Sequence, residues 1–305
     1  MINFGKTYEI RLYRSRFDEE PYLTIVSDQK NMLRITFEIK KSYLSALSRN
    51  SLTLIIYNLK QGTRDLIRDT NDYIEFKAGW RGYPLKTIFR GEALAVNHRV
   101  SPPNAVTEML CLDNIAAENN TSNWSFGENT YNYVAVEKII KEDNIEVGYN
   151  GIDKEAKFAS GYAASDTKSI DVIKDIANKA DCVVAINDGK LDIFRKNIQN
   201  LSEEVKDQLK EEAIPVNEQN GMIGYPQRFG NNFKNPFLTR VVAANYSNSW
   251  RSAVQLNGDI RIYKYVSITC PALNINSQVG LVIGVLHAGD THGGVWQTTI
   301  DSFGV

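Results

Sequence analysis

Residues 91–113 read GEALAVNHRVSPPNAVTEMLCLD, and residues 280–301 read GLVIGVLHAGDTHGGVWQTTID. Both stretches begin with glycine, run through an apolar strand to histidine, turn, and return through a strand that contains threonine and reaches aspartate. The interval from histidine to threonine differs by two residues, so chance similarity of two hairpins explains this echo about as well as a duplication does. The echo nevertheless permits two related β domains in one chain. The matched positions are Gly91, His98, Thr107 and Asp113, and Gly280, His287, Thr298 and Asp301.

The first third of the chain predicts closely spaced β-strands. Residues 8–12 and 35–39 alternate apolar and polar side chains, which is the period of a half-buried strand. Residues 52–57 are almost continuously apolar, which is typical of a strand covered on both faces. Strands this close together favour an antiparallel barrel or sandwich. The other expected elements are strands at 73–78, 87–100 and 106–112, a turn at 102–104 and one helical turn within 62–68.

The middle of the chain predicts a small α+β module. Residues 133–141 place apolar side chains at helical spacing, and Ser169 is the expected N-cap of a second helix. Asp188 and Gly189 then form a strong hairpin-turn signal between two short strands. The second helix gathers Ile170, Ile173, Ile176, Ala177 and Ala180 on one face. The strands are expected at 182–186 and 191–194, and residues 201–212 are expected to form a charged helix or linker.

The last third returns to β patterning. Residues 260–270 place apolar side chains on one face of a long strand that Lys264 interrupts, and we expect Ile268 to be buried there. Residues 221–236 are rich in Gly, Asn, Pro and aromatic residues and predict a long ordered loop. The apolar face consists of Ile260, Ile262, Val266, Ile268 and Cys270. The other expected strands are 239–244, 280–287 and 295–303.

Charge divides the chain into three parts. The whole chain of 305 residues has a net charge of −1, but residues 116–215 carry 12 basic and 19 acidic side chains, a net −7. Residues 1–115 stand at +4 and residues 216–305 at +2. We therefore expect a β domain at 1–115, an acidic α+β module at 116–215 and a second β domain at 216–305. None is basic enough to indicate nucleic-acid recognition.

Composition and the first residues argue against a membrane-spanning protein and against a protein secreted through a signal peptide. The chain is 43% apolar and 23% charged, as soluble globular proteins are. A membrane-spanning helix needs about 20 consecutive apolar residues, and the sequence has no such run. The first residues lack the apolar core of a signal peptide. We expect neither a membrane span nor secretion through a signal peptide.

One cluster has the composition of a metal site. His287, Asp290 and His292 stand within six residues and include two imidazoles and a carboxylate, which are ligands for divalent metals. The alternative is a glycine-rich hairpin turn with exposed polar side chains, and this alternative is favoured because no further ligand can be named. We expect no metal and no cofactor. His98 is expected to end a strand.

Other candidate chemistry is sparse. Phosphate-binding, dinucleotide-binding, nucleophile-elbow and zinc-protease motifs are absent from the sequence. Cys111, Cys182 and Cys270 lie far apart and are expected to be buried, reduced thiols. The tryptophans, one in each region, are expected to be core or interface anchors rather than sugar platforms. These tryptophans are Trp80, Trp124, Trp250 and Trp296. Because no catalytic constellation is present, the chain is not expected to be an enzyme.

Several stretches, in this order along the chain, resemble the baseplate hub proteins of tailed phages, the group that includes the late control D proteins. Each stretch alone is degenerate, and the ordered set spans most of the chain. The stretches are SLTLIIYNL (51–59), KQGTRDLI (60–67), YIEFKAGWRG (73–82), IFRGEALAVNHRV (88–100), SIDVIKDIANKADCVVAINDGKLDIFRK (169–196), GMIGYPQ (221–227) and VIGVLHAGDTHGGVWQTTI (282–300).

The resemblance implies a mainly β fold in which two tail-tube-like antiparallel β-barrel domains flank a helix-plus-hairpin module. Residues 52–57, 260–270 and 281–287 would be barrel strands. Three copies would form a pseudo-sixfold ring that adapts a sixfold tail tube to a threefold central spike. The implied partners are the tube and spike proteins, with the tape-measure and baseplate wedge proteins as further candidates. The implied location is the tail of a virion assembled in the host cytoplasm.

Three alternatives remain open from the sequence. The first is the hub of a tail-derived bacteriocin or contractile injection system, which would share the fold. The second is a metal-assisted hydrolase that uses His287, Asp290 and His292. The third is a carbohydrate-binding β module with exposed aromatic side chains. The resemblance carries over no catalytic residue.

Overall fold

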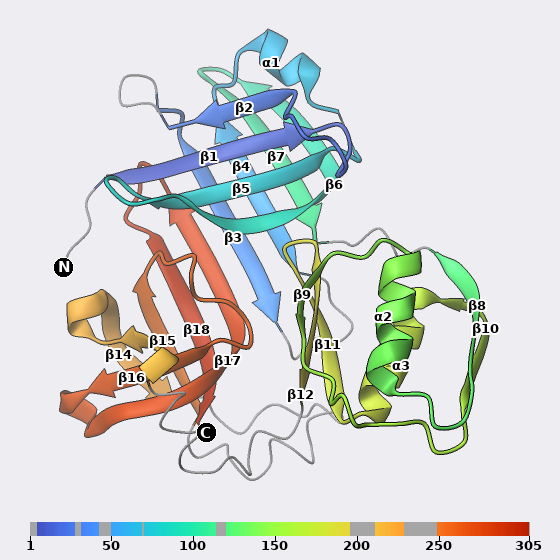
Figure 1. The fold of residues 1–305 in the computed structure, drawn as a ribbon. Helices are drawn as coiled ribbons and strands as arrows, with labels where there is room; N and C mark the ends of the chain where they lie inside the picture. The colour runs from blue at the N-terminus through green and yellow to red at the C-terminus, as the bar shows by residue number, and fades with distance from the viewer. Residues whose placement is uncertain are drawn as a thin grey trace. The chain divides into compact units, whose positions relative to one another are not determined.

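The computed structural model of the chain describes residues 5–27, 32–42, 50–68, 70–113, 120–195, 211–228 and 249–304. Contacts between residues divide the chain into two compact units (Figure 1). Unit 1 comprises Met1–Asp113 and Leu201–Val305, and unit 2 comprises Asn114–Asn200. The fold is mainly antiparallel β with a small helical part, which confirms the predicted fold class.

Unit 1 contains one 13-stranded sheet. Its pairs are antiparallel, except that β13 runs parallel to β16. The N-terminal elements are β1 (Lys6–Tyr13), β2 (Leu23–Val26), β3 (Ile35–Ser42), β4 (Ser51–Tyr57), α1 (Gln61–Leu66), β5 (Tyr73–Trp80), β6 (Lys86–Ser101) and β7 (Asn104–Leu112). The C-terminal strands are β13 (Ile214–Val216), β14 (Met222–Arg228), β15 (Ser249–Gln255), β16 (Tyr265–Cys270), β17 (Ile275–Asp290) and β18 (Trp296–Gly304).

The N-terminal strands follow the predicted alternation. Tyr8, Ile10 and Leu12 of β1 face the core, and β3 buries its alternate apolar side chains in the same way. β1 and β5 lie across β3, β4 and β7, so the buried side chains of both layers form one core (Figure 1). The prediction that β4 is covered on both faces is wrong, because Thr53, Ile55 and Tyr57 are only half-buried on its second face.

Two 16-residue strands, β6 and β17, change partner along their length. The first half of β6 pairs with β5 and the second half with β7. The first half of β17 pairs with β16 and the second half with β18. Each strand has a bulge at the change, after Ala93 in β6 and after Val282 in β17. Bulges bend strands and increase their twist, so each long strand connects two layers.

The two halves of unit 1 repeat one order of six strands. The N-terminal order is β1–β5–β6–β7–β4–β3, and the C-terminal order is β13–β16–β17–β18–β15–β14. Apart from β2, which has no C-terminal equivalent, each strand occupies the same sequential place in both halves. The one difference in direction is that β13 runs parallel to β16, whereas β1 runs antiparallel to β5. Equivalent positions of β6 and β17 lie 189 residues apart, as His98 and His287 do. The predicted echo therefore extends to topology, to the bulge and to the cross-strand pairs His98–Thr107 and His287–Thr298.

Some C-terminal expectations are wrong. Only Tyr265–Cys270 forms a strand within residues 260–270, because Tyr263 adopts a left-handed φ of 65° that a continuous strand cannot accommodate. Ile260 and Ile262 are still buried. Residues 222–228 of the predicted loop form strand β14, whose irregular pairing accommodates Gly224 and Pro226. The predicted strand at 239–244 and residues 201–210 and 229–236 lie outside the described residues.

Unit 2 has its own core between two helices and two small sheets. The predicted helices and hairpin are present, and Asp188 and Gly189 take positive φ angles of 55° and 78°, as a tight hairpin turn requires. Ser169 is not the N-cap: it is the first helical residue, and its side chain makes no capping hydrogen bond. The elements are β8 (Thr121–Phe126), α2 (Asn132–Glu142), β9 (Val147–Asn150), β10 (Tyr162–Lys168), α3 (Ser169–Lys179), β11 (Cys182–Asn187) and β12 (Lys190–Arg195).

Candidate functional site

His287, one of the three metal candidates, is a core residue. It lies on β17, and its Nδ1 is 2.9 Å from Oγ1 of Thr298 on β18. Burial lowers the pKa of His287 to about 3, and the positive charges of Lys41 and Arg261 act in the same direction. The imidazole is therefore neutral at physiological pH. Among the described residues, no group of three or more His, Cys, Asp or Glu side chains is placed to hold a metal ion.

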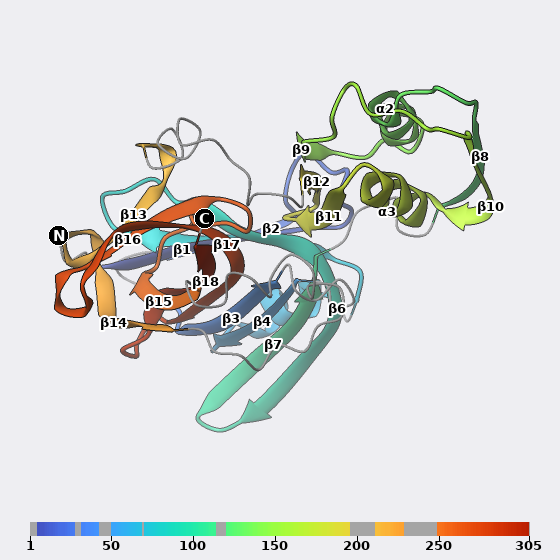
Figure 2. The same cartoon turned by 90° about the horizontal axis from the view of Figure 1, so that it is seen from below.

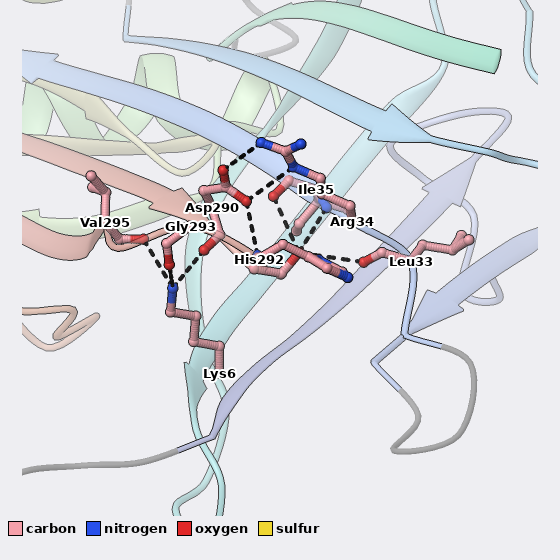
Figure 3. Close-up of polar contacts among 9 residues, drawn as sticks. Lys6, Leu33, Arg34, Ile35, Asp290, His292, Gly293 and Val295 are labelled. Atoms are coloured by element: carbon pink, nitrogen blue, oxygen red, sulfur yellow. Dashed lines mark hydrogen bonds and ion pairs between the residues drawn. The ribbon is translucent and has the colours of Figure 1, made fainter. Parts of the chain in front are cut away.

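Asp290 is the last residue of β17 and His292 lies in the turn that follows, and Asp290 contacts the N-terminal half of unit 1 (Figure 3). Arg34 donates hydrogen bonds from Nε and Nη2 to the Asp290 carboxylate, at 3.3 and 2.8 Å. The hydrogen bond from Arg34 holds the pKa of Asp290 below its ordinary value. The His292 amide also donates to this carboxylate at 2.9 Å. The carboxylate therefore orders the turn and bridges the two halves.

Lys6 and Thr291 add further bonds between the halves. The Lys6 ammonium donates to the carbonyl oxygen of Asp290 at 2.6 Å and to that of Gly293 (Figure 3). The Thr291 hydroxyl accepts a hydrogen bond from the Ile35 amide at 2.9 Å. These contacts hold the tip of the β17–β18 hairpin against the start of β1 and β3. Sequence spacing could not reveal them, because the partners lie more than 250 residues apart.

The two halves are joined along a strand ladder that we call the internal junction: β3 paired with residues 284–290 of β17. Phe37 of β3 and Trp296 of β18 pack edge to face at this junction, with ring centroids 5.2 Å apart. Gly289 of β17 lies between them, and a side chain at this position would overlap the Phe37 ring. The junction thus combines backbone pairing, an aromatic contact and the Arg34–Asp290 ion pair.

Apolar side chains are exposed on two other strands of unit 1. Leu94 and Val100 are exposed on β6, and Ile223 and Tyr225 are exposed on β14. Within the described parts of the chain, residues 95–101 of β6 pair only with β7, and β14 pairs only with β15. Exposed apolar residues on open strand edges are typical of surfaces that bind another strand. The sequence alone does not reveal these edges, since an apolar residue in a strand pattern is ordinarily expected to be buried.

The remaining candidates are structural. Trp124, Trp250 and Trp296 are buried, and the half-buried Trp80 donates its indole N–H to the Leu256 carbonyl oxygen at 3.0 Å. No tryptophan therefore offers an exposed platform for a sugar ring. The three cysteines are buried and form no disulfide, and burial raises the pKa of the Cys111 thiol. In the part of the chain that the structure describes, no helix has the length and apolar character to cross a membrane.

Comparison with solved structures finds the same fold in tail proteins. The tail protein from Neisseria meningitidis MC58 matches with a TM-score of 0.63 and 10% identity, over 98% of this chain and 97% of that chain. The 43 kDa tail protein of prophage MuSo2 from Shewanella oneidensis matches with a TM-score of 0.60 and 10% identity, over 98% of both chains. No protein-family model matches the sequence, and neither does any curated protein.

A secretion component has the same fold. The E. coli c3393 protein matches with a TM-score of 0.54 and 11% identity, over 97% of this chain and 76% of that chain. It is described as a component of the type VI secretion system that is structurally similar to the T4 bacteriophage tail proteins gp27 and gp5. At these identities the likeness establishes the fold, which this chain shares with phage tail proteins along nearly its whole length.

Proposed function

We propose that this chain is the structural hub of a phage-type tail baseplate. Three copies form a ring that joins a sixfold tail tube to a threefold central spike. The repeated six-strand order within one chain carries the proposal, because three such chains present six similar units around one axis. One ring can then match sixfold symmetry through its repeated units and threefold symmetry through its chains. The shared fold with two tail proteins supports this role.

The proposed domains are a β domain at 1–115, an α+β module at 116–215 and a second β domain at 216–305. The partners are a second and third copy of the chain, the tube protein and the spike protein. The tape-measure protein and baseplate wedge proteins are further contacts. The ring is a passage and an adaptor, so neither catalysis nor base-specific DNA contacts are part of the role. The protein works in the virion tail, after assembly in the host cytoplasm.

Electron cryomicroscopy of tail particles tests this role. The particles are purified from cells that encode a peptide-tagged chain, and the tag is located with a gold-labelled antibody. We expect label at one end of the tail tube, between tube and spike, and tubes without spikes when the gene is deleted. Label along the whole tube, or no label on particles, would contradict the hub role. The same position in a capsid-less particle would assign the hub to an injection system or bacteriocin, the setting that the secretion component suggests.

A further inference from the structure

The internal junction has an equivalent pair of strands that do not pair with each other among the described residues. In the repeat, β14 is the equivalent of β3, and β6 is the equivalent of β17. β3 pairs with the outer edge of residues 284–290 in β17. The same edge in β6 belongs to residues 95–101, which have only β7 as a ladder partner among the described residues. β14 likewise ends the described sheet.

Side-chain exposure distinguishes the paired strand from its unpaired equivalent. At the bulge, Ile283 of β17 is 1% exposed, whereas its equivalent Leu94 is 54% exposed. Farther along, Gly289 is buried beneath Phe37, whereas its equivalent Val100 is 66% exposed. The N-terminal repeat therefore exposes apolar side chains at positions that are buried in the C-terminal repeat. Figure 2 shows the β6–β7 hairpin projecting past β3 and β4.

The complementary strand β14 is also exposed. Ile223 is 44% exposed and Tyr225 is 64% exposed. An open edge with exposed apolar side chains can bind an added strand through backbone hydrogen bonds. One chain therefore carries both halves of a second junction, on two different strands. The occupant that fits each half is another copy of this chain.

We propose that β14 of one copy pairs antiparallel with residues 98–101 of β6 in the next copy and repeats the internal junction between chains. This contact is head-to-tail, and such contacts give a closed ring or an open filament according to their rotation. That the contact closes into a ring of three chains rests on the proposed function. In a ring of three chains, the six six-strand halves, two from each chain, are joined alternately by the internal junction and by this second junction.

The ladders fix the register of the second junction. In the internal junction, Glu38 of β3 lies opposite Ala288 of β17. Gln227 is the β14 equivalent of Glu38, and Arg99 is the β6 equivalent of Ala288. Gln227 of one copy is therefore placed opposite Arg99 of the next. The cross-strand pairs that carry this alignment are Glu38–Thr53, Thr53–Leu110, Gln227–Arg251 and Arg251–Asp301.

The ion pair of the internal junction is not repeated. Ser101 stands at the position equivalent to Asp290, and Gly221 at the position equivalent to Arg34. The second junction therefore depends on backbone hydrogen bonds and apolar contacts. We expect its assembly to be insensitive to ionic strength, because exposed ion pairs are the contacts that salt weakens.

Disulfide cross-linking tests the register. In the variant Arg99→Cys/Gln227→Cys, the two new thiols would lie on directly opposed residues, whose Cα atoms are about 4.5–5.5 Å apart in an antiparallel pair. This separation suits a disulfide. The three native cysteines are buried and do not compete. After mild oxidation, we expect dimers and trimers on a non-reducing gel, no larger species, and reversal by a reductant.

The control is Leu110→Cys/Gln227→Cys, which moves one thiol to the next strand, β7. It should give at least ten-fold less cross-link. Equal cross-linking by both pairs, or none from Arg99→Cys/Gln227→Cys in a particle of three-chain mass, would overturn the pairing and leave the hub proposal intact. A single-chain mass without cross-linking would overturn both proposals. A cross-linked ladder beyond three copies would retain the pairing and overturn the ring.

A second variant tests the surface without new thiols. Val100→Lys places a charge in the second junction, and a lysine on an edge strand opposes strand addition. Because Val100 is exposed, the melting temperature of the single chain should change little, while the three-chain particle should be lost. The matched control Val26→Lys alters an exposed valine on β2 and should leave assembly unchanged. Undiminished assembly of folded Val100→Lys would contradict the proposal.

Discussion

Ile268→Asp is expected to prevent the chain from folding. Ile268 is 1% exposed and lies on β16, which pairs with β13 on one side and β17 on the other. An unpaired buried carboxylate destabilises a protein by at least several kcal/mol. The free energy of unfolding of a typical domain is only about 5–15 kcal/mol. The variant should therefore be insoluble, or lack a cooperative unfolding transition by circular dichroism.

Ser267→Asp is the matched control for this experiment. Ser267 is the preceding residue of β16, points to the opposite face and is half-buried, so a carboxylate there remains in contact with water. It should fold with a loss of about 1 kcal/mol, the centre of the distribution for point mutations. A soluble Ile268→Asp with wild-type cooperativity would contradict the placement of β16 in the core.

Gly91→Ala is expected to have the second largest effect on stability. A Cβ atom at Gly91 would overlap the backbone carbonyl oxygen of Leu112, on the strand that pairs with β6. A backbone atom cannot turn away as a flexible side chain can. Overpacking costs about 1–3 kcal/mol and occasionally more, so we expect a loss near the upper end of that range. The measurement is the free energy of unfolding from urea titration.

The equivalent glycine in the C-terminal half of the same chain provides the comparison. A Cβ at Gly280 would lie 3.1 Å from the carbonyl oxygen of Phe303, which is the equivalent of Leu112. Gly280→Ala should therefore destabilise the fold less than Gly91→Ala. Gly62→Ala, in the exposed helix α1 with open space around it, should raise stability by about 0.5–1 kcal/mol. A loss from Gly91→Ala no greater than that from Gly280→Ala would contradict the close approach.

Much of unit 1 could be predicted because its strands bury alternate side chains. Alternation predicted the strands around Ile10 and Phe37, and an almost continuous apolar run predicted the strand around Leu54. Alternation indicates burial more securely than strand geometry, since Ile260 and Ile262 are buried although they lie outside any strand. The left-handed backbone of Tyr263 interrupts the strand here without exposing these side chains. The Gly and Pro content of residues 222–228 suggested a loop. The prediction failed because an irregular edge strand tolerates Gly and Pro.

The candidate site was harder to predict because its contacts are long-range. The spacing of His287, Asp290 and His292 has the composition of a metal site. The structure instead places His287 in the core against Thr298 and Asp290 in an ion pair with Arg34. The open edges of β6 and β14 depend on which strands pair, and no local pattern encodes pairing between distant strands. The sequence echo pointed to the repeat, and the shared register now extends it to six strands.

The central claim is that each chain contributes two of the six similar six-strand halves that form a ring of three chains. The mass of the purified chain in solution, measured by multi-angle light scattering over a concentration series, tests it most directly. The chain has a mass of 34.4 kDa, and we predict a particle of three times this mass. A particle that stays at 34.4 kDa at the highest soluble concentration, or one that grows without limit as concentration rises, would contradict the claim.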